Sequence, residues 1–511
     1  MTSAPAAHRP REKIFHGDFR LTIRPNGPNG GTGGLVSPVV NTVQHPSPPD
    51  APTPGPAPAA APANTRGRVI TASMVGTTIE FFDFYAYATA ASLVFPALFF
   101  PTQTAANQLL SSFAVFGVAF IARPVGSLLF GHFGDRVGRK TTLVASLLVM
   151  GIATFLIGVL PTASTPGFEI IAPSILVLLR FCQGIGLGGE WSGAALLATE
   201  NAPPGKRALY GTFPQLGAPL GFVLSNVLFV LLSLQLTDEQ FMSWGWRVPF
   251  LLSAFLVVVG LWVRLKLMES PAFQKVIDEE RVAAVPIARV FRTAWKPLIL
   301  ATIAMVATYV LFYLMTAFLM VVGTTAADEE TARAAAEAAG KPFDAAGFAP
   351  GLGYERPQFL TMLIIGVVFF GIFTLVSGPL ADRLGRRKLL LGVTAAIGCF
   401  GFLVEPLMQG GTVGVMAALI LGFTLMGLTF GPMAAFLPEM FKADVRYTGS
   451  AVSYNMASVI GAAPAPYAMI ALWQALDGGL WLVGGYLSLA AVITIVALLI
   501  GKETREVDYL A

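Results

Sequence analysis

GHFGDRVGRK at residues 131–140 and GPLADRLGRR at residues 378–387 are two copies of one short basic loop, and each follows a long hydrophobic stretch. A second element follows each copy: a Glu and an Arg stand seven positions apart, at Glu200 and Arg207 and again at Glu439 and Arg446. The two glutamates are separated by 239 residues, 439 minus 200. The chain is therefore an internal duplication.

The composition predicts an integral membrane protein. The 511 residues are 55% hydrophobic and only 12% charged, whereas soluble domains carry about 25% charged residues. The net charge of +4 does not indicate nucleic-acid binding, because the basic residues are spread over short loops. Cys182 and Cys399 both lie inside apolar segments, so neither a disulfide framework nor a metal site is indicated.

Twelve segments are apolar enough to span a bilayer, which takes about 20 mainly apolar residues. We predict an all-α membrane protein with two six-helix halves, an architecture that opens one site to either side of a membrane. The first half comprises 69–97, 106–130, 141–161, 171–199, 209–235 and 246–267. The second half comprises 297–324, 357–380, 389–408, 412–437, 447–474 and 479–500.

Lysine and arginine are concentrated in the loops on one side of these spans, so the positive-inside rule predicts that both termini are cytoplasmic. The predicted domains are a disordered Pro/Ala-rich tail (1–66), the first half (67–267), a cytoplasmic linker (268–296), the second half (297–500) and a cytoplasmic C-terminal tail (501–511). An insertion at 325–356, rich in alanine and in charge, is expected to face outward, with room for a short helix.

Two carboxylates lie deep in the first predicted span, where an ionisable group costs on the order of 3 kcal/mol. Glu80 and Asp83 are roughly 16 to 21 Å from its cytoplasmic end, at ~1.5 Å per residue. They share a stripe with Gly76 and Tyr87 at helical spacing, so both should point toward the bundle interior. Neighbouring carboxylates resist ionising together, and we expect these two, with Glu190, to couple protons to the function of the chain.

Two arginines lie well inside later spans, Arg123 in the second and Arg180 in the fourth. A guanidinium group stays charged and binds a carboxylate through two parallel hydrogen bonds. A substrate carboxylate can therefore compete with Glu80 or Asp83 for an arginine, which would couple proton binding to substrate binding. The alternative is a fixed structural ion pair between these acids and arginines.

Polar and aromatic side chains within the spans complete the predicted binding site. The further candidates are Tyr87, Gln183, Trp191, Gln215, Tyr309, Tyr454 and Asn455. For the aromatic residues, packing between helices is the commoner role. For the amides, an interhelical hydrogen bond is an equally good explanation.

The enzyme signatures in the chain do not fit their context. Gly184-Ile-Gly186-Leu-Gly-Gly189 matches the GxGxxG pattern, but a dinucleotide site needs a preceding strand in a soluble βαβ unit, and this match lies inside a hydrophobic segment. No Walker-type loop, HExxH motif or GxSxG elbow occurs in the chain. We therefore expect no enzymatic activity, no metal, no nucleic-acid partner and no cofactor, with a proton as the coupling ion.

The duplicated loops resemble the signature of the major facilitator superfamily, and Arg180-Phe-Cys-Gln183-Gly resembles the fourth-helix motif of its proton-coupled members. Further motifs resemble the metabolite:H+ symporter family: IEFFDFY at 79–85, GLGGEWSGAALLATENAP at 186–203, WGWRVPF at 244–250, ESPAF at 269–273 and LPEMFKADVRYTGSAVSYN at 437–455. The resemblance extends from about residue 68 to the C-terminus, and the tail and the insertion 325–356 depart from it.

This resemblance implies a twelve-helix carrier in the cell inner membrane that alternates access between two sides and imports organic acids or zwitterionic osmolytes with protons. It also implies that the duplicated motifs lock the two halves together on the cytoplasmic side. The implied gate residues are Asp135, Arg136, Arg139, Glu200 and Arg207 in the first half and Asp382, Arg383, Arg386, Glu439 and Arg446 in the second. A role in topology alone is the alternative for these basic loops.

We expect proton-coupled uptake of a small metabolite that carries a carboxylate, by a protein that acts as a monomer in the lipid bilayer. A proton-linked carrier of proline or betaine is the first alternative. A membrane sensor that uses the same fold without transporting anything is the second.

Overall fold

The computed structural model describes residues 65–102, 105–265, 286–338, 343 and 348–507, and within these ranges the regular elements are helices without strands. Eleven helical segments among the described residues are long and apolar enough to cross a membrane. They are Ala114–Gly134, Lys140–Val159, Ile171–Glu200, Arg207–Gln235, Gly245–Leu265, Trp295–Thr324, Arg356–Leu384, Arg386–Met408, Gly411–Glu439, Ala443–Gln474 and Trp481–Ile500. The predicted all-α membrane fold is confirmed.

The first predicted span is helix α1 (Arg66–Leu93), which is not among these eleven segments. Its 28 residues are enough to cross a bilayer. Glu80 and Asp83 lower its apolar character. The remaining elements of the first half are α2 (Phe95–Phe99), α3 (Ala105–Val137), α4 (Arg139–Val159), α5 (Ile171–Glu200), α6 (Arg207–Gln215), α7 (Gly217–Gln235), α8 (Asp238–Ser243), the 3-10 turn η1 (Gly245–Arg247) and α9 (Val248–Leu265).

The second half repeats the long helices of the first. Its elements are α11 (Pro286–Thr293), α12 (Trp295–Ala304), α13 (Val306–Tyr313), η2 (Leu314–Phe318), α14 (Leu319–Thr324), α15 (Glu329–Ala338), α16 (Arg356–Leu384), α17 (Arg386–Met408), α18 (Gly411–Glu439), η3 (Ala443–Val445), α19 (Arg446–Ala457), η4 (Ser458–Ala462), α20 (Ala465–Gln474) and α21 (Trp481–Ile500). Helix α15 lies within the insertion 325–356, where the sequence allowed a short helix. The predicted linker 268–296 is described only from residue 286, and the N-terminal tail only from residue 65.

Besides the break at Val94 near the end of 69–97, three predicted spans, 209–235, 297–324 and 447–474, are interrupted helices. The first divides into α6 and α7 at Leu216, two residues after Pro214, because proline removes a backbone donor and clashes with the preceding turn. The other two contain the π-helical turns η2 and η4, which are frequent at functional sites. Irregular backbone at this depth is tolerated where it is buried in protein or lines a cavity.

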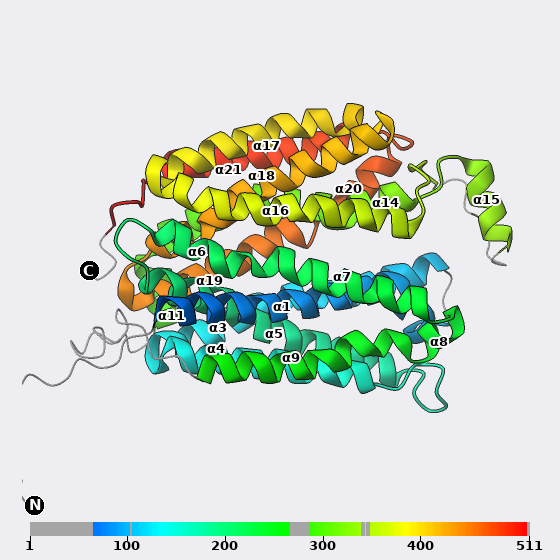
Figure 1. The fold of residues 1–511 in the computed structure, drawn as a ribbon, viewed down its shortest axis with the longest axis horizontal. Helices are drawn as coiled ribbons and strands as arrows, with labels where there is room; N and C mark the ends of the chain where they lie inside the picture. Colours follow the sequence, from blue (N-terminus) through cyan, green and yellow to red (C-terminus); the bar gives the residue numbers. More distant parts are fainter. Residues whose placement is uncertain (1–64, 103–104, 266–285, 339–342, 344–347, 508–511) are drawn as a thin grey trace, which may run out of the picture. The chain divides into compact units, whose positions relative to one another are not determined.

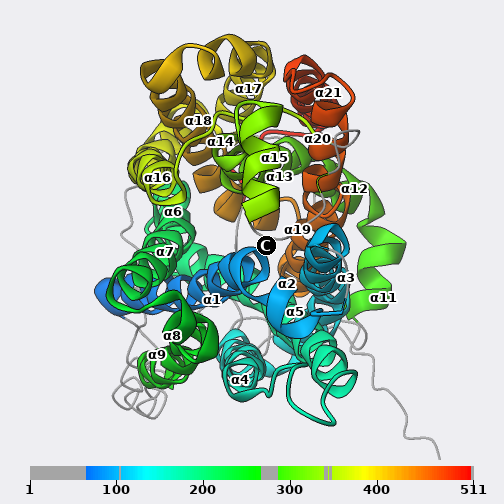
Figure 2. The same ribbon diagram turned by 90° about the vertical axis from the view of Figure 1, so that its right-hand side faces the viewer.

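Helices of each half pack mainly on one another. In the first half α5 packs on α3 and α4, and α1 packs on α7 and α9; in the second, α18 packs on α16 and α17, and α21 packs on α17. Figure 1 shows the helices of the first half, coloured blue to green, beside those of the second, coloured lime green to red. Figure 2 shows the same bundle along the helices, with α15 and α20 toward the viewer.

The halves meet through helices that correspond in the duplication: α3 packs on α19, and α16 packs on α6. Glycine permits both contacts. A Cβ atom on Gly131 would lie 3.0 Å from the Cα of Thr448, and one on Gly378 would lie 2.7 Å from the Cα of Leu209. The first residue of each duplicated loop is thus a point of close approach between halves, which a side chain would prevent.

The eighth residue of each loop is also required to be glycine, for a different reason. Gly138 (φ 115°) separates α3 from α4, and Gly385 (φ 99°) separates α16 from α17. Residues with a Cβ are disfavoured at such φ values, so glycine lets two long helices join through one residue. We call the end of the bundle that carries residues 131–140 and 378–387 the motif end.

Candidate functional site

A cavity lies between the halves. Its walls come from α1, α3, the broken helix at α12 and α13, α18 and α19. The lining residues are Phe81, Phe84, Arg123, Met305, Thr308, Tyr309, Phe312, Tyr313, Met426, Phe430 and Tyr454. Three predicted binding residues, Arg123, Tyr309 and Tyr454, are therefore brought together from both halves.

Arg123 is the charged residue of this lining, and it is 6% exposed. Its guanidinium carbon lies 5.2 Å from the ring centroids of both Phe84 and Phe120, and its Nε has no hydrogen-bond partner. Within the described residues no carboxylate forms an ion pair with it. A buried cation left in this condition is costly unless an anion reaches it.

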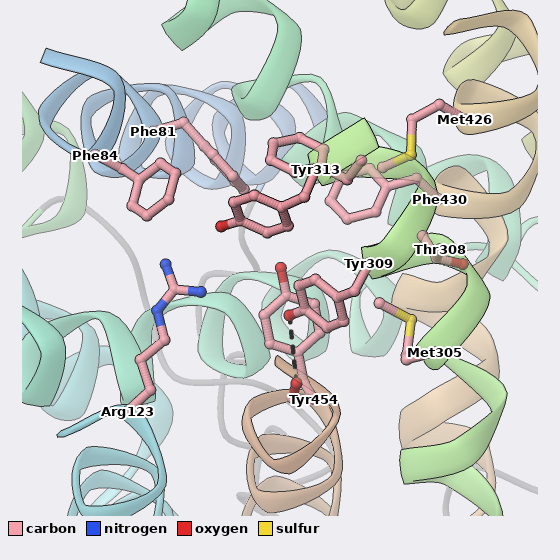
Figure 3. A pocket seen from close by; sticks show the side chains of 11 residues that line it. Phe81, Phe84, Arg123, Met305, Thr308, Tyr309, Tyr313, Met426, Phe430 and Tyr454 are labelled. Atoms are coloured by element: carbon pink, nitrogen blue, oxygen red, sulfur yellow. Dashed lines mark hydrogen bonds between the residues drawn. The ribbon is translucent and has the colours of Figure 1, made fainter. Parts of the chain in front are cut away.

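Tyrosines face Arg123 across the cavity, as Figure 3 shows. Tyr309, Tyr313 and Tyr454 all interact electrostatically with the guanidinium group. The Tyr309 hydroxyl donates a hydrogen bond to the carbonyl oxygen of Tyr454 at 3.3 Å. Sequence reasoning left Tyr313 out of the binding set, although its spacing of four residues from Tyr309 places both on one face of a helix.

Trp191 and Gln215 support the cavity wall from behind. The Trp191 ring stacks on that of Tyr454 with centroids 3.9 Å apart, and its Nε1 donates to Gln215 Oε1 at 2.8 Å. Gln215 Nε2 in turn donates to the carbonyl oxygen of Phe430 at 2.6 Å, across the halves. Asn455 makes a second such bond, from Nδ2 to the carbonyl oxygen of Gly188 at 2.9 Å. These three residues do not line the cavity, and the structure gives them interhelical contacts.

Arg180 lies in the interior of the first half, away from the cavity lining. Its guanidinium carbon is 4.0 Å from the ring centroid of Tyr87, and one Nη donates to Gln183 Oε1 at 3.0 Å. Gln183 Nε2 donates to Thr154 Oγ1 at 2.7 Å, and Thr154 Oγ1 donates to Asp83 Oδ2 at 2.9 Å. A continuous chain of hydrogen bonds therefore joins Arg180 to Asp83. Thr154 was not among the candidates, because a threonine in an apolar span carries no distinctive signal.

Glu190 forms a buried ion pair with Arg264 of α9. Ser146 Oγ donates to Glu190 Oε2 at 3.0 Å, and Arg264 also donates to the carbonyl oxygen of Leu143 at 2.6 Å. Arg264 was not among the predicted site residues; it is 2% exposed in the last turn of α9. Gly76 of α1 makes room for it, since a Cβ there would lie 2.9 Å from Arg264 Nε.

Glu80 and Asp83 are both buried in α1, as their helical stripe predicted. Within the described residues neither carboxylate forms an ion pair with Arg123 or Arg180, although Glu80 interacts electrostatically with Arg123 and Arg264. Glu80 Oε2 and Asp83 Oδ1 have no hydrogen-bond partner. The fixed ion pair considered from the sequence is therefore not formed, and the arginines lie against aromatic rings instead.

Three of the second-half gate residues, Asp382, Arg386 and Glu439, form one cluster at the motif end. Arg386 donates from Nη2 to Glu439 Oε1 at 3.1 Å and also pairs with Asp382 at 3.1 Å. Asp382 accepts hydrogen bonds from the backbone N–H groups of Ala208 at 3.1 Å and Leu209 at 3.0 Å. A carboxylate of the second half thus caps α6 of the first half.

The other gate candidates make contacts of different kinds. Arg136 is exposed and lies 3.3 Å from a ring nitrogen of His132, while Glu200 ends α5. Arg207 and Arg446 begin α6 and α19, where they donate to the carbonyl oxygens of Val507 at 2.7 Å and Phe441 at 3.2 Å. The carbonyl oxygen of Arg383 accepts from Arg505 at 3.1 Å. The side chains of Asp135 and Arg139 lie outside the described residues.

The C-terminal segment adds partners that sequence reasoning missed. Thr504 Oγ1 donates to Glu439 Oε2 at 2.7 Å. Glu503 accepts from the N–H groups of Arg386 at 2.9 Å and Arg387 at 3.1 Å, so it caps α17. A Glu-Thr pair beyond the last span looks like an ordinary polar tail in the sequence, which is why its contacts could not be anticipated.

Two matched helical halves around a central, mainly aromatic cavity, joined at one end by duplicated loops, are the architecture of a membrane transporter. The family model described as "Major Facilitator Superfamily" matches residues 74–466. The chain belongs to the major facilitator superfamily, and the resemblance of its duplicated motifs is confirmed.

Named relatives carry the comparison further. The chain is 53% identical to "Inner membrane metabolite transport protein YhjE" of Escherichia coli (strain K12), over 87% of this chain and 96% of that protein. It is 35% identical to the "Shikimate transporter" of the same organism, over 86% of this chain and 95% of that protein. Among solved structures, XylE of E. coli, a proton:xylose symporter bound to 6-bromo-6-deoxy-D-glucose, covers 86% of this chain and 98% of its own at 16% identity, with a TM-score of 0.62. The chain is therefore a multi-pass membrane transporter of a small molecule.

Proposed function

We propose that the protein imports a small carboxylate-bearing metabolite together with protons, by alternating access across the inner membrane. The observation that carries this proposal is Arg123, a buried guanidinium group that lines the cavity between the halves without an ion-pair partner in the described residues. Arginine matches the two oxygens of a carboxylate, and one such group suits a monoanion. The aromatic walls suit a compact, largely apolar or cyclic body.

Protons enter the cycle through the acids of α1. Glu80 interacts electrostatically with Arg123, so it competes with any substrate carboxylate for that cation. When a proton neutralises Glu80, Arg123 is left to the substrate; when the substrate leaves, Arg123 again stabilises the ionised acid. Asp83, tied to Arg180 through Gln183 and Thr154, extends this coupling into the first half. Glu190 has the weaker case, because Arg264 already neutralises it.

Alternating access uses the motif end as one gate. We assign it to the cytoplasmic side by the positive-inside rule. Helix α1 adds one span to the eleven described above, which gives twelve and places both termini in the cytoplasm. The working unit is a monomer. In this arrangement the Asp382 cap on α6, the Arg386–Glu439 pair and the close approach of α3 to α19 hold the cytoplasmic side shut. Breaking them admits the inward-facing state.

A zwitterionic osmolyte is a second candidate, and the tyrosine wall favours it. The rings of Tyr309, Tyr313 and Tyr454 can hold a quaternary ammonium group by cation–π attraction while Arg123 holds the carboxylate of the same molecule. Betaine and an aromatic monocarboxylate would then use the same arginine and differ only in the group that faces the tyrosines.

Thermal stability of the purified protein identifies the ligand first, because a ligand stabilises the state it binds. The panel is shikimate, citrate, 2-oxoglutarate, lactate, benzoate, proline and betaine. Stabilisation by monocarboxylates, lost in Arg123→Gln, supports the proposal; stabilisation by betaine alone favours the osmolyte.

Uptake of the ligand into proteoliposomes then tests the coupling. Accumulation should require an inward proton gradient and collapse with an uncoupler, while exchange in the absence of a gradient persists. Accumulation that is unchanged without the gradient would refute proton symport.

A further inference from the structure

A cationic and aromatic patch lies at the motif end of the second half, where α11 leads into α12. Figure 1 places α11 at the same end of the bundle as α6. Arg289, Arg292 and Lys296 are exposed and follow one another at helical spacing, three and four residues apart. The stretch 286–299 contains no acidic residue. This is a local concentration of positive charge on one short helical surface.

Two aromatic side chains lie beside these cations. Phe291 is 50% exposed and Trp295 is 49% exposed, and Lys296 Nζ lies 5.5 Å from the centroid of the Trp295 ring. Ile299, four residues after Trp295, is exposed in turn and continues this face along the spanning helix. Val290 points the other way and is fully buried, so it anchors α11 against the protein. The patch therefore extends from charged residues, through two aromatic rings, to exposed apolar surface on the spanning helix.

The charges of the patch are only partly neutralised. Arg289 forms an ion pair with Asp444 of η3 at 2.6 Å. Arg292 and Lys296 form no ion pair with any side chain that the structure describes. A cation on a surface that borders the bilayer can be neutralised by anions from the solvent or by lipid headgroups. The aromatic rings beside these two cations are typical of the headgroup level and favour the second source.

We propose that α11 and the first turn of α12 bind the headgroup of an anionic phospholipid. Arg292 and Lys296 contact its phosphate, and Phe291 and Trp295 lie at the boundary between headgroup and acyl chain. Arg289 connects this site to Asp444, in the turn between α18 and α19, so the lipid sits next to the gate of the second half. The inference rests on the exposed patch alone and not on the identity of the transported substrate.

Lipid titration of the full-length protein in detergent tests the site. Dioleoylphosphatidylglycerol is added to the purified protein, with dioleoylphosphatidylcholine and inorganic phosphate as parallel probes. Retained lipid is counted by native mass spectrometry, and thermal stability is measured in the same samples. In the wild type we expect saturable retention of phosphatidylglycerol, a raised melting temperature, and neither effect with phosphatidylcholine or inorganic phosphate.

The double variant Arg292→Gln with Lys296→Gln should bind phosphatidylglycerol roughly 30-fold more weakly, given the usual contribution of two basic residues at an anionic surface. Both side chains are exposed, so the melting temperature in phosphatidylcholine should stay at the wild-type value and show that the variant is folded. The matched control is Lys206→Gln with Lys502→Gln, which removes the same charge from exposed positions near the motif end but outside the patch. Equal phosphatidylglycerol binding in the two double variants, or equal protection by inorganic phosphate, would overturn the lipid site.

Discussion

The Asp382→Ala variant should shift the protein toward the state in which the motif end is open. Asp382 belongs to α16 in the second half, and the two N–H groups that it caps belong to α6 in the first. These hydrogen bonds can exist only while the halves are together at this end. Arg386 keeps Glu439 as a partner in the variant, so the ion pair within the second half survives.

The size of the shift follows from the two bonds, 3.1 and 3.0 Å long, on a carboxylate that is 8% exposed. A helix cap contributes about 1 kcal/mol and a hydrogen bond to a charged group about 1.5 kcal/mol or more. We therefore expect the closed state to lose about 2–3 kcal/mol. The ratio of open to closed molecules rises roughly 30- to 150-fold.

Maleimide labelling of a single cysteine measures this ratio. Thr448 is fully buried under Gly131 at the contact between α19 and α3, so Thr448→Cys reports opening of the motif end. Cys182 and Cys399 are first replaced by alanine to remove the native thiols. Labelling with a membrane-impermeant reagent applied to the motif-end face should accelerate strongly in Asp382→Ala.

The matched control is Glu503→Gln. Glu503 also accepts two backbone hydrogen bonds at a helix start, from Arg386 and Arg387, but all three residues lie on the second-half side of the gate. It should lower the melting temperature without faster labelling of the reporter. Equal labelling rates in wild type and Asp382→Ala would refute the idea that Asp382 holds the halves together.

Three further predictions concern single side chains. Arg123→Lys keeps the charge but loses the planar guanidinium group that can bind both oxygens of a carboxylate. Affinity for a carboxylate ligand, measured by thermal shift, should therefore fall by about 1.5–3 kcal/mol, roughly 10- to 150-fold. Unchanged affinity would show that the guanidinium group does not hold substrate. Arg264→Gln leaves Glu190 buried without its cation and should cost about 3–5 kcal/mol of stability in detergent unfolding, whereas replacing both residues by leucine should cost less; an equal or larger loss in the double variant would contradict this. Gly385→Ala places a Cβ at a φ of 99° and should lower the free energy of unfolding by about 1–3 kcal/mol. Its control, Gly392→Ala, has open space around it inside α17 and should be neutral or stabilising. Equal effects of the two substitutions would rule out backbone strain as the cause.

The pattern of apolar segments predicted the spans well, because a bilayer forces each crossing helix to be long, apolar and complete in its own hydrogen bonds. The breaks inside three spans were not visible in that pattern, since π-helical turns do not change hydropathy. Among the predicted site residues, Arg123, Tyr309 and Tyr454 line the cavity. Gln183 and Arg180 were expected beside them but form a separate chain with Thr154 and Asp83.

The partners of the buried charges explain this difference. Depth in a span is set by position along one helix, so Glu80, Asp83, Arg123 and Arg180 could all be identified as buried from their distance to a loop. Which charges meet is set by the rotation and approach of neighbouring helices, and a residue at the end of a span, such as Arg264, can turn inward where a glycine opposite leaves room.

The sequence by itself determined the duplication, the membrane-spanning class and the family, because repeats, apolar length and short motifs are linear properties of a chain. Only the tertiary structure decided that Arg123 lines the cavity while Arg180 lies behind it, that Glu190 pairs with Arg264, and that Asp382 caps a helix of the other half. The two contacts join residues that are 74 and 174 positions apart in the sequence, and the places of Arg123 and Arg180 differ by the width of a helix. They depend on how the helices pack, which no single segment specifies.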